Sequence, residues 1–316
     1  MKTIINNEFP EKLNPLNDYL FYKVMGEKGD EVQLLGFLNA VFGRSGKKPI
    51  VSLEIMENTS FVKKIQDGKS CILDVLAVLQ DGTKVNIEVQ LGNQHNMDRR
   101  SLFYLGTVYT DGIKEGDNYR DLPNVVAVNI VDFNFPPRGG VHTSFRLHED
   151  TDPSLILTEA LEIHCINMVQ WRKLKEKDIR NEPLHRWLTR FDRNSTPELI
   201  EEVANMDGAI MAANDKLNDV MRDEETRRTY WRCEMARMDM NGQLEYARDE
   251  GWGEGFGEGY NDGVKQGIER GIEQGIEQTS IEIARKMKNA GRPLAEIENF
   301  TGLSPVIIEK LQGSTD

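Results

Sequence analysis

Two strand patterns that flank a tight turn constrain the fold more than any other feature of this 316-residue chain. Residues 71–79 (CILDVLAVL) and 84–91 (KVNIEVQL) are rich in β-branched and aliphatic residues, and Asp81-Gly82 between them is a strong hairpin signal. A third run, residues 124–132 (NVVAVNIVD), is mostly apolar and β-branched, which is consistent with a buried strand. The chain is therefore expected to build a sheet around one antiparallel pair.

The remaining periodicity is mostly helical. Apolar residues recur at three- and four-residue spacing over 14–44, and residues 95–115 also predict a helix. The other expected elements are strands at 51–56, 142–148 and 161–170, and helices from about residue 176 to the end. The order helix, strand, strand, strand, helix, strand indicates an α/β fold with a mixed sheet.

Composition excludes several classes of protein. No apolar run approaches the ~18 residues of a membrane span, and the start of the chain lacks the apolar run of a signal peptide. The cysteines Cys71, Cys165 and Cys233 are far apart, show no metal-ligand spacing and suit a reducing compartment. We therefore expect a cytoplasmic protein with no membrane partner.

The net charge of -13 is unevenly spread. Residues 1–135 carry 15 Lys/Arg and 18 Asp/Glu, a balance of -3, whereas the remainder carries 24 and 34, a balance of -10. An acidic chain does not coat nucleic acid. A DNA contact is therefore expected only on the near-neutral first part of the chain.

The predicted hairpin holds three polar residues, Asp74, Glu88 and Gln90, that suggest metal chemistry. Carboxylates on neighbouring strands supply the hard oxygen ligands that Mg²⁺ prefers. A two-residue turn would place Asp74 and Glu88 on opposite faces of the sheet, whereas a three-residue loop with Gly82 in the left-handed position would place them opposite each other on one face. Alternatively, these residues are ordinary polar positions on the solvated face of an amphipathic strand.

The surrounding sequence resembles the Rpn family of recombination-promoting nucleases and transposases, within the PD-(D/E)XK nuclease superfamily. The matching stretches are NPLNDYLFYKVMG with LLGFLNAVFG, then ILDVLAVLQDGTKVNIEVQ, then RRSLFYLGTVYTDGIKEGDNYRDLPNVVAVNIVDF, which together cover roughly residues 14–133. The resemblance implies a restriction-endonuclease-like core with a helical C-terminal extension. It also implies a DNA endonuclease that uses Mg²⁺, or Mn²⁺, to hydrolyse phosphodiester bonds.

The resemblance also implies roles for individual residues. Asp74 matches the metal-binding Asp, Glu88 the second acidic ligand, and Asp18 an acidic position that completes the site, although an acid there also suits the N-terminus of a helix. Gln90 stands where the broader superfamily has Lys, and Gln has neither positive charge nor basicity at neutral pH.

The missing charge at Gln90 leaves three explanations open. The metal carries more of the charge stabilisation, a cation such as Lys84, Arg99 or Arg100 replaces the lysine, or catalysis is impaired. In the last case the chain would be a catalytically degenerate nuclease fold that acts as a DNA-binding or oligomeric interaction protein.

The predicted helix at 95–115 carries three candidate DNA contacts, Arg99, Arg100 and Tyr104. Their side chains could hold DNA phosphates. Alternatively, the arginines form a basic patch that pairs with Asp98 or Glu115.

From residue 251 to residue 275 a glycine occupies every fourth position. Each glycine costs about 1 kcal/mol of helix propensity relative to alanine, so a helix here needs a partner to offset that cost. We expect a homo-oligomerisation helix; the alternative is a flexible linker.

Residues 281–311 have helix–turn–helix punctuation, with Gly291 ending one helix and Gly302 in a turn before the next. The expected small core contains Ile283, Met287, Leu294, Ile297, Phe300, Leu303, Ile307 and Leu311. A packing or oligomer module is favoured over a DNA reader, because basic residues are scarce after Arg292.

Four regions are therefore expected. They are a nuclease-like domain (1–175), a helical region (176–250), the glycine-repeat helix (251–278) and a small helix–turn–helix-like module (279–316). The five histidines, at positions 95, 142, 148, 164 and 185, are scattered, and none is assigned a role.

Overall fold

The computed structural model describes residues 13–56, 75–111, 113 and 115–311. The chain divides into two compact units, Met1–Asn241 and Gly242–Asp316. Asp74 lies outside the described residues, and so does most of the segment that precedes the predicted hairpin. Within the described part, no helix is both long and apolar enough to cross a bilayer.

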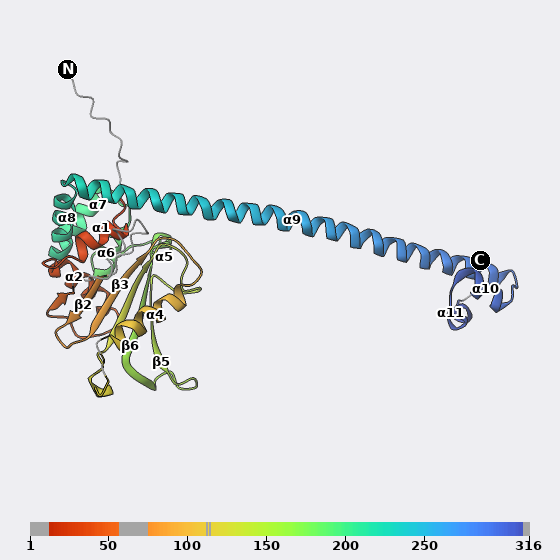
Figure 1. The fold of residues 1–316 in the computed structure, drawn as a ribbon, viewed down its shortest axis with the longest axis horizontal. Coiled ribbons are helices and arrows are strands. Elements are labelled where there is room, and N and C mark those ends of the chain that lie inside the picture. The colour runs from red at the N-terminus through yellow and green to blue at the C-terminus, as the bar shows by residue number, and fades with distance from the viewer. Residues whose placement is uncertain (1–12, 57–74, 112, 114, 312–316) are drawn as a thin grey trace, which may run out of the picture. The chain divides into compact units, whose positions relative to one another are not determined.

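In the described part of the first unit, six strands form one sheet in the order β1-β2-β3-β4-β6-β5 (Figure 1). Their bounds are Leu53–Ile55 (β1), Val75–Leu79 (β2), Lys84–Gln90 (β3), Val125–Val131 (β4), His142–His148 (β5) and Ile156–Asn167 (β6). The β3–β4 and β4–β6 pairs are parallel, and the other pairs are antiparallel. The mixed sheet confirms the expected α/β class.

Helices lie on both faces of the sheet, and further helices follow it in the chain. The bounds of all of these helices are Asp18–Met25 (α1), Glu31–Gly43 (α2), Met97–Thr110 (α4), Met168–Lys173 (α5), Pro183–Phe191 (α6), Pro197–Met206 (α7), Gly208–Val220 (α8) and Glu224–Asn289 (α9), with a 3₁₀ turn at Tyr119–Asp121. Every residue of β4 is buried, as expected for a strand covered on both sides.

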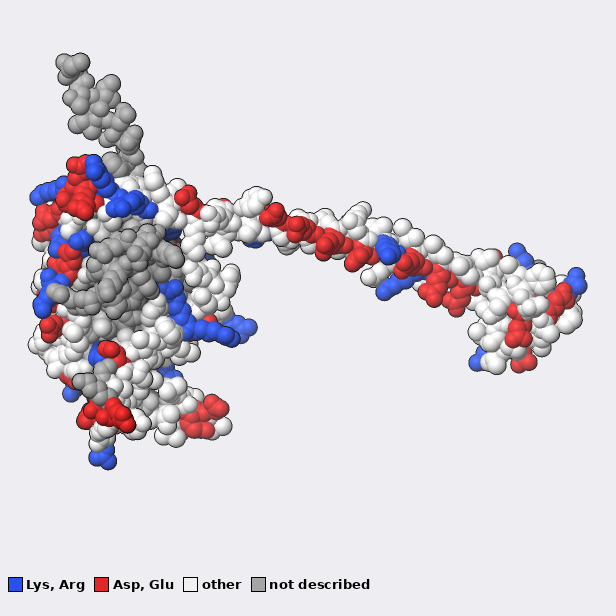
Figure 2. Space-filling view, viewed as in Figure 1, with Lys and Arg blue, Asp and Glu red and all other residues white. Residues whose placement is uncertain are grey.

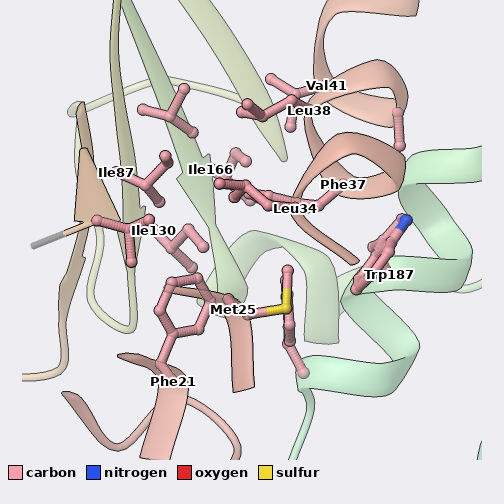
Figure 3. Packing of buried hydrophobic residues seen from close by; sticks show 14 of the residues in the cluster. Phe21, Met25, Leu34, Phe37, Leu38, Val41, Ile87, Ile130, Ile166 and Trp187 are labelled. Atoms are coloured by element: carbon pink, nitrogen blue, oxygen red, sulfur yellow. The ribbon is translucent and has the colours of Figure 1, made fainter. Parts of the chain in front are cut away.

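The larger core lies between one face of the sheet and the helices α1, α2 and α6 (Figure 3). Phe21, Phe37 and Trp187 pack there against alternate residues of the strands, such as Ile87 and Ile130. The opposite face is covered by α4, whose Leu105 packs on Val125 and Ala127. We call this second side the α4 face.

The helices that follow the sheet belong to the same core. Leu184 and Trp187 of α6, Val203 of α7 and Ile210 of α8 are buried in the cluster that contains the sheet residues. The expected boundary at residue 175 stays a prediction, but the main hydrophobic core does not end there.

Several element boundaries differ from the expected ones. The helix predicted over 14–44 is two helices, because the chain turns at Gly26–Gly29 and Gly29 has a φ of 102°. Asn17 starts the first of them by accepting a hydrogen bond from the Leu20 N–H at 3.1 Å. The strand predicted at 161–170 instead spans Ile156–Asn167, since the Asn167 side chain caps α5 by accepting from the Gln170 N–H.

In the second unit, the last part of α9 packs against α10 (Leu294–Thr301) and α11 (Pro305–Lys310). Gly291 and Gly302, with φ of 72° and 70°, terminate helices as predicted. The core differs from the expected one. Ala284, Ile297 and Ile308 are buried, with Met287, Leu303 and Leu311 around them. The expected core residues Ile283, Leu294, Phe300 and Ile307 are exposed, because these short helices meet at a small residue.

The glycine repeat lies wholly within α9. The helical conformation contradicts the alternative of a flexible linker.

Candidate active site on the α4 face of the sheet

The β2–β3 hairpin has the three-residue loop, which is the loop that would place Asp74 and Glu88 on one face of the sheet. Val75 pairs with Ile87, and Val78 with Lys84. The Leu79 N–H donates to the Thr83 carbonyl at 2.9 Å, and the Gly82 φ is 84°, in the left-handed region that favours glycine. The predicted register is therefore confirmed over the described residues.

This register decides which face each residue of β3 occupies. Val85, Ile87 and Val89 join the larger core. Because side chains alternate along a strand, Glu88 and Gln90 lie on the α4 face. Extending the register by one residue would place Asp74 opposite Glu88, but Asp74 lies outside the described residues, so that pairing stays a prediction.

Glu88 is a buried acid with one oxygen left unsatisfied. The residue is 1% exposed, and its Oε1 accepts a hydrogen bond from the Nε of Arg100 on α4. Its Oε2 is buried and has no hydrogen-bond partner among the described residues. Burial raises the pKa of Glu88, and the Arg100 guanidinium opposes part of that rise.

The Arg100–Glu88 ion pair corrects the expected pairing of Arg100 and reduces the number of cations that could replace the superfamily lysine. Arg100 does not pair with Asp98 or Glu115 but with Glu88. Lys84 lies at the far end of β3 and binds Asp111, and Arg99 is exposed. Of the three cations considered as replacements for the superfamily lysine, Arg100 is the one in contact with the predicted metal-binding acid.

The other predicted site residues are Tyr104, Gln90 and Asp18. The Tyr104 ring centroid is 5.3 Å from the Arg100 guanidinium carbon. Gln90 is half-buried and ends β3 beside Val131. Asp18 is half-buried in the first turn of α1, and its role as a ligand stays a prediction.

Sequence reasoning missed Asn129. This residue pairs with Glu88 in the parallel β3–β4 register and is 1% exposed. Its amide lies 3.5 Å from the His164 carbonyl. An asparagine inside an otherwise apolar buried strand was the available signal, because a buried amide needs partners.

The described residues contain part of a metal site. No group of three His, Cys, Asp or Glu residues among them could hold a metal ion. Glu88 nevertheless offers a hard carboxylate oxygen that is buried and unsatisfied, which fits a divalent cation completed by further oxygen ligands.

A second buried glutamate, Glu162 of β6, lies on the opposite face of the sheet. Its Oε1 is 3.0 Å from Arg146 Nη2 and 2.9 Å from His164 Nε2, and its Oε2 accepts from Lys47. Burial alone would raise the pKa of Glu162, but the interactions with His164 and Lys47 outweigh it and hold that pKa at about 2. His164 also contacts His142, with ring nitrogens 2.8 Å apart.

A mixed sheet that carries a buried acid on the strand after a hairpin, beneath a helix, is consistent with the PD-(D/E)XK class of nuclease folds. The chain belongs to the PD-(D/E)XK nuclease family transposases, whose family model matches residues 15–247. This match confirms the resemblance. No curated protein and no solved structure matched the chain.

Proposed function

We propose that this protein is a metal-dependent DNA endonuclease that hydrolyses phosphodiester bonds during recombination or transposition-related DNA processing. One observation carries the proposal: Glu88, which the resemblance matches to the second acidic ligand, is buried and its Oε2 has no hydrogen-bond partner among the described residues. A buried carboxylate oxygen without a partner is costly, and functional sites are where such costs persist.

In this proposal Asp74 and Glu88 hold Mg²⁺ or Mn²⁺, with Asp18 as a further acidic ligand. The bound metal would activate water and stabilise charge on the scissile phosphate. Gln90 hydrogen-bonds the water or a phosphate oxygen, but it cannot accept the proton. Water adds to phosphorus, the bond from phosphorus to the leaving oxygen breaks, and the water's proton ends on solvent or the leaving group.

Arg100 supplies the positive charge that Gln90 lacks. Its guanidinium contacts Glu88, the predicted ligand, and a guanidinium donates to phosphate oxygens in a fixed fork. Arg99 and Tyr104 lie on the same helix and are proposed to contact the DNA backbone.

A plasmid-nicking assay tests this proposal. Wild type should nick supercoiled DNA in Mg²⁺ or Mn²⁺ and not in EDTA, and Asp74→Ala and Glu88→Gln should not. Glu54→Gln is the matched control, because Glu54 is an exposed strand glutamate bound only weakly by Lys28 at 3.4 Å. Nicking that survives Asp74→Ala would contradict the proposal.

The second candidate is a catalytically degenerate fold that binds DNA or assembles without turnover. The Arg100–Glu88 pair favours it, because the guanidinium occupies an oxygen that a metal would use. No nicking in any divalent metal, together with saturable DNA binding, would support this candidate.

We further propose that α9 pairs with α9 of a second copy. Seven exposed apolar residues each follow a glycine of the repeat: Trp252, Phe256, Tyr260, Val264, Ile268, Ile272 and Ile276. Acidic side chains follow the helix (Figure 2), which disfavours DNA as its partner.

An antiparallel pairing centred on Val264 is supported by the sizes of the side chains. It sets Trp252 opposite the partner's Ile276, so large rings of one helix meet smaller chains of the other. Because a four-residue period exceeds the 3.6 of a straight helix, the crossing should be right-handed.

Sedimentation of variants in this apolar row tests the pairing. Ile268→Glu or Ile272→Glu should weaken the dimer, because each puts a charge among the residues that the pairing buries. Glu258→Gln is the control, since Glu258 is exposed and lies on the opposite side of the helix from the row. A monomeric wild type at all concentrations would contradict the proposal.

A further inference from the structure

The helical layer of the first unit contains a groove that no part of the nuclease proposal uses. Its volume is about 590 Å³, and its walls come from α6, α7, α8 and the residues just before α1. It is therefore separate from the α4 face, where Glu88 and Arg100 lie.

A buried arginine lines this groove and has no partner among the described residues. Arg190, in the last turn of α6, is 3% exposed, and its Nε is buried with no hydrogen-bond partner in that part of the chain. Within the described residues its guanidinium forms no ion pair. In contrast, Arg186, one turn earlier, donates to the carbonyls of Ile179 and Arg180.

Arg190 remains charged in this environment. Burial lowers the pKa of Arg190 to about 10, which is still far above neutrality. The C-terminal end of α6 offsets part of the cost of burial through the helix dipole. Burying an uncompensated charge costs more than this offset, so an anion bound to Arg190 would stabilise the protein.

The acids that line the groove do not meet this demand. Asp192 is bound by Arg172 at 2.9 Å and accepts from Asn194. Glu201 and Asp215 are exposed and form no ion pair with Arg190. Their charges are largely screened by water.

The rest of the wall indicates the chemical class of the occupant. Apolar surface comes from Pro15, Ile200, Ala204, Met211 and Leu217, and neutral amides come from Asn205, Asn214 and Asn218. Ligand sites typically combine an apolar wall with a few polar groups that fix orientation. We propose that this groove binds an organic anion, whose phosphate or carboxylate accepts hydrogen bonds from Arg190 and whose apolar or aromatic body rests on the α7–α8 wall.

Calorimetry and thermal unfolding of the full chain test the proposal, with ionic strength held constant by NaCl. The probes are deoxyadenosine monophosphate, inorganic phosphate and octanoate. At least one organic probe should bind with 1:1 stoichiometry and raise Tm. Nucleotide binding alone would identify a phosphate head, and octanoate binding alone a carboxylate head.

Arg190→Met should weaken that binding at least tenfold and should raise the Tm of the unliganded protein, because it removes an unpaired buried charge. Arg222→Met is the control, since Arg222 is exposed and bound only to nearby Asp219. Ile200→Glu provides a second variant that keeps Arg190 but repels an anion. The proposal is overturned if no probe binds saturably, if Arg190→Met binds as wild type does, or if Arg190→Met unfolds at a lower temperature.

Discussion

Two buried glutamates lie on opposite faces of one sheet and have opposite surroundings. Glu162 is 4% exposed and has a cation or a histidine at each oxygen. Glu88 is 1% exposed, shares one oxygen with Arg100 and leaves the other without a partner. The two side chains are buried to nearly the same extent, so their different pKa values arise from their different partners.

The difference distinguishes a structural acid from a candidate functional one. The pKa of Glu162 is held at about 2, so the folded protein favours its charged form, whereas the pKa of Glu88 is raised. A carboxylate with complete partners has nothing left to offer a ligand. A carboxylate with an oxygen that has no partner can still bind a metal ion.

The largest expected effect is on activity. Glu88→Gln should reduce DNA nicking by about 1000-fold, or about 4 kcal/mol, because metal-ion charge stabilisation is worth several kcal/mol. Glu162→Gln should retain nicking at temperatures where it is folded. Equal losses in the two variants, measured by initial rates, would erase the functional distinction between the two acids.

The stability of the folded protein should depend more on Glu162 than on Glu88. Glu162→Gln should lower the free energy of unfolding by about 3 kcal/mol at pH 7, because it leaves Lys47 and Arg146 without a charge partner. Urea unfolding measures this, with Glu54→Gln as the control. Since the folded pKa of Glu162 is about 2 and its ordinary value is 4.5, the deficit should shrink as pH falls from about 4.5 towards 2.

Arg100→Gln should reduce nicking by roughly 10- to 100-fold, as removal of a partner of a metal ligand does. It should also shift the acidic limb of the pH–rate profile to higher pH. The sign follows because Arg100 lowers the pKa of Glu88, so its removal lets that pKa rise further. An unchanged profile would show that Glu88 is not the titrating acid. Arg222→Gln is the control, because Arg222 is an exposed arginine that pairs with Asp219 and has no part in the proposed site.

The smallest expected effect concerns His142. Burial and the neighbouring His164 lower the pKa of His142 to about 4 from 6.5. The unfolded chain therefore binds a proton first, and the stabilisation present above pH 6.5 is lost as pH falls towards 4. His142→Gln should flatten the decrease of Tm between pH 7.5 and pH 5.5. A parallel decrease in both proteins would assign the pH dependence elsewhere.

The sequence by itself determined the local structure of several segments. The hairpin follows from Asp81-Gly82, because both a two-residue and a three-residue loop need a left-handed residue that Gly82 supplies. The structure then selects the three-residue loop, in which Val78 pairs with Lys84. The burial of β4 and the helix ends at Gly291 and Gly302 could likewise be predicted, since each depends on neighbouring residues alone.

Only the tertiary structure decided which side chains meet across elements. Arg99 and Arg100 are equivalent in sequence, yet the rotation of α4 on the sheet brings Arg100 to Glu88 and turns Arg99 to solvent. Asn129 beside Glu88, Glu162 among its cations and Arg190 without an anion depend in the same way on how layers pack. Contacts between residues far apart in the chain depend on the relative position of whole elements, and no local pattern encodes that position.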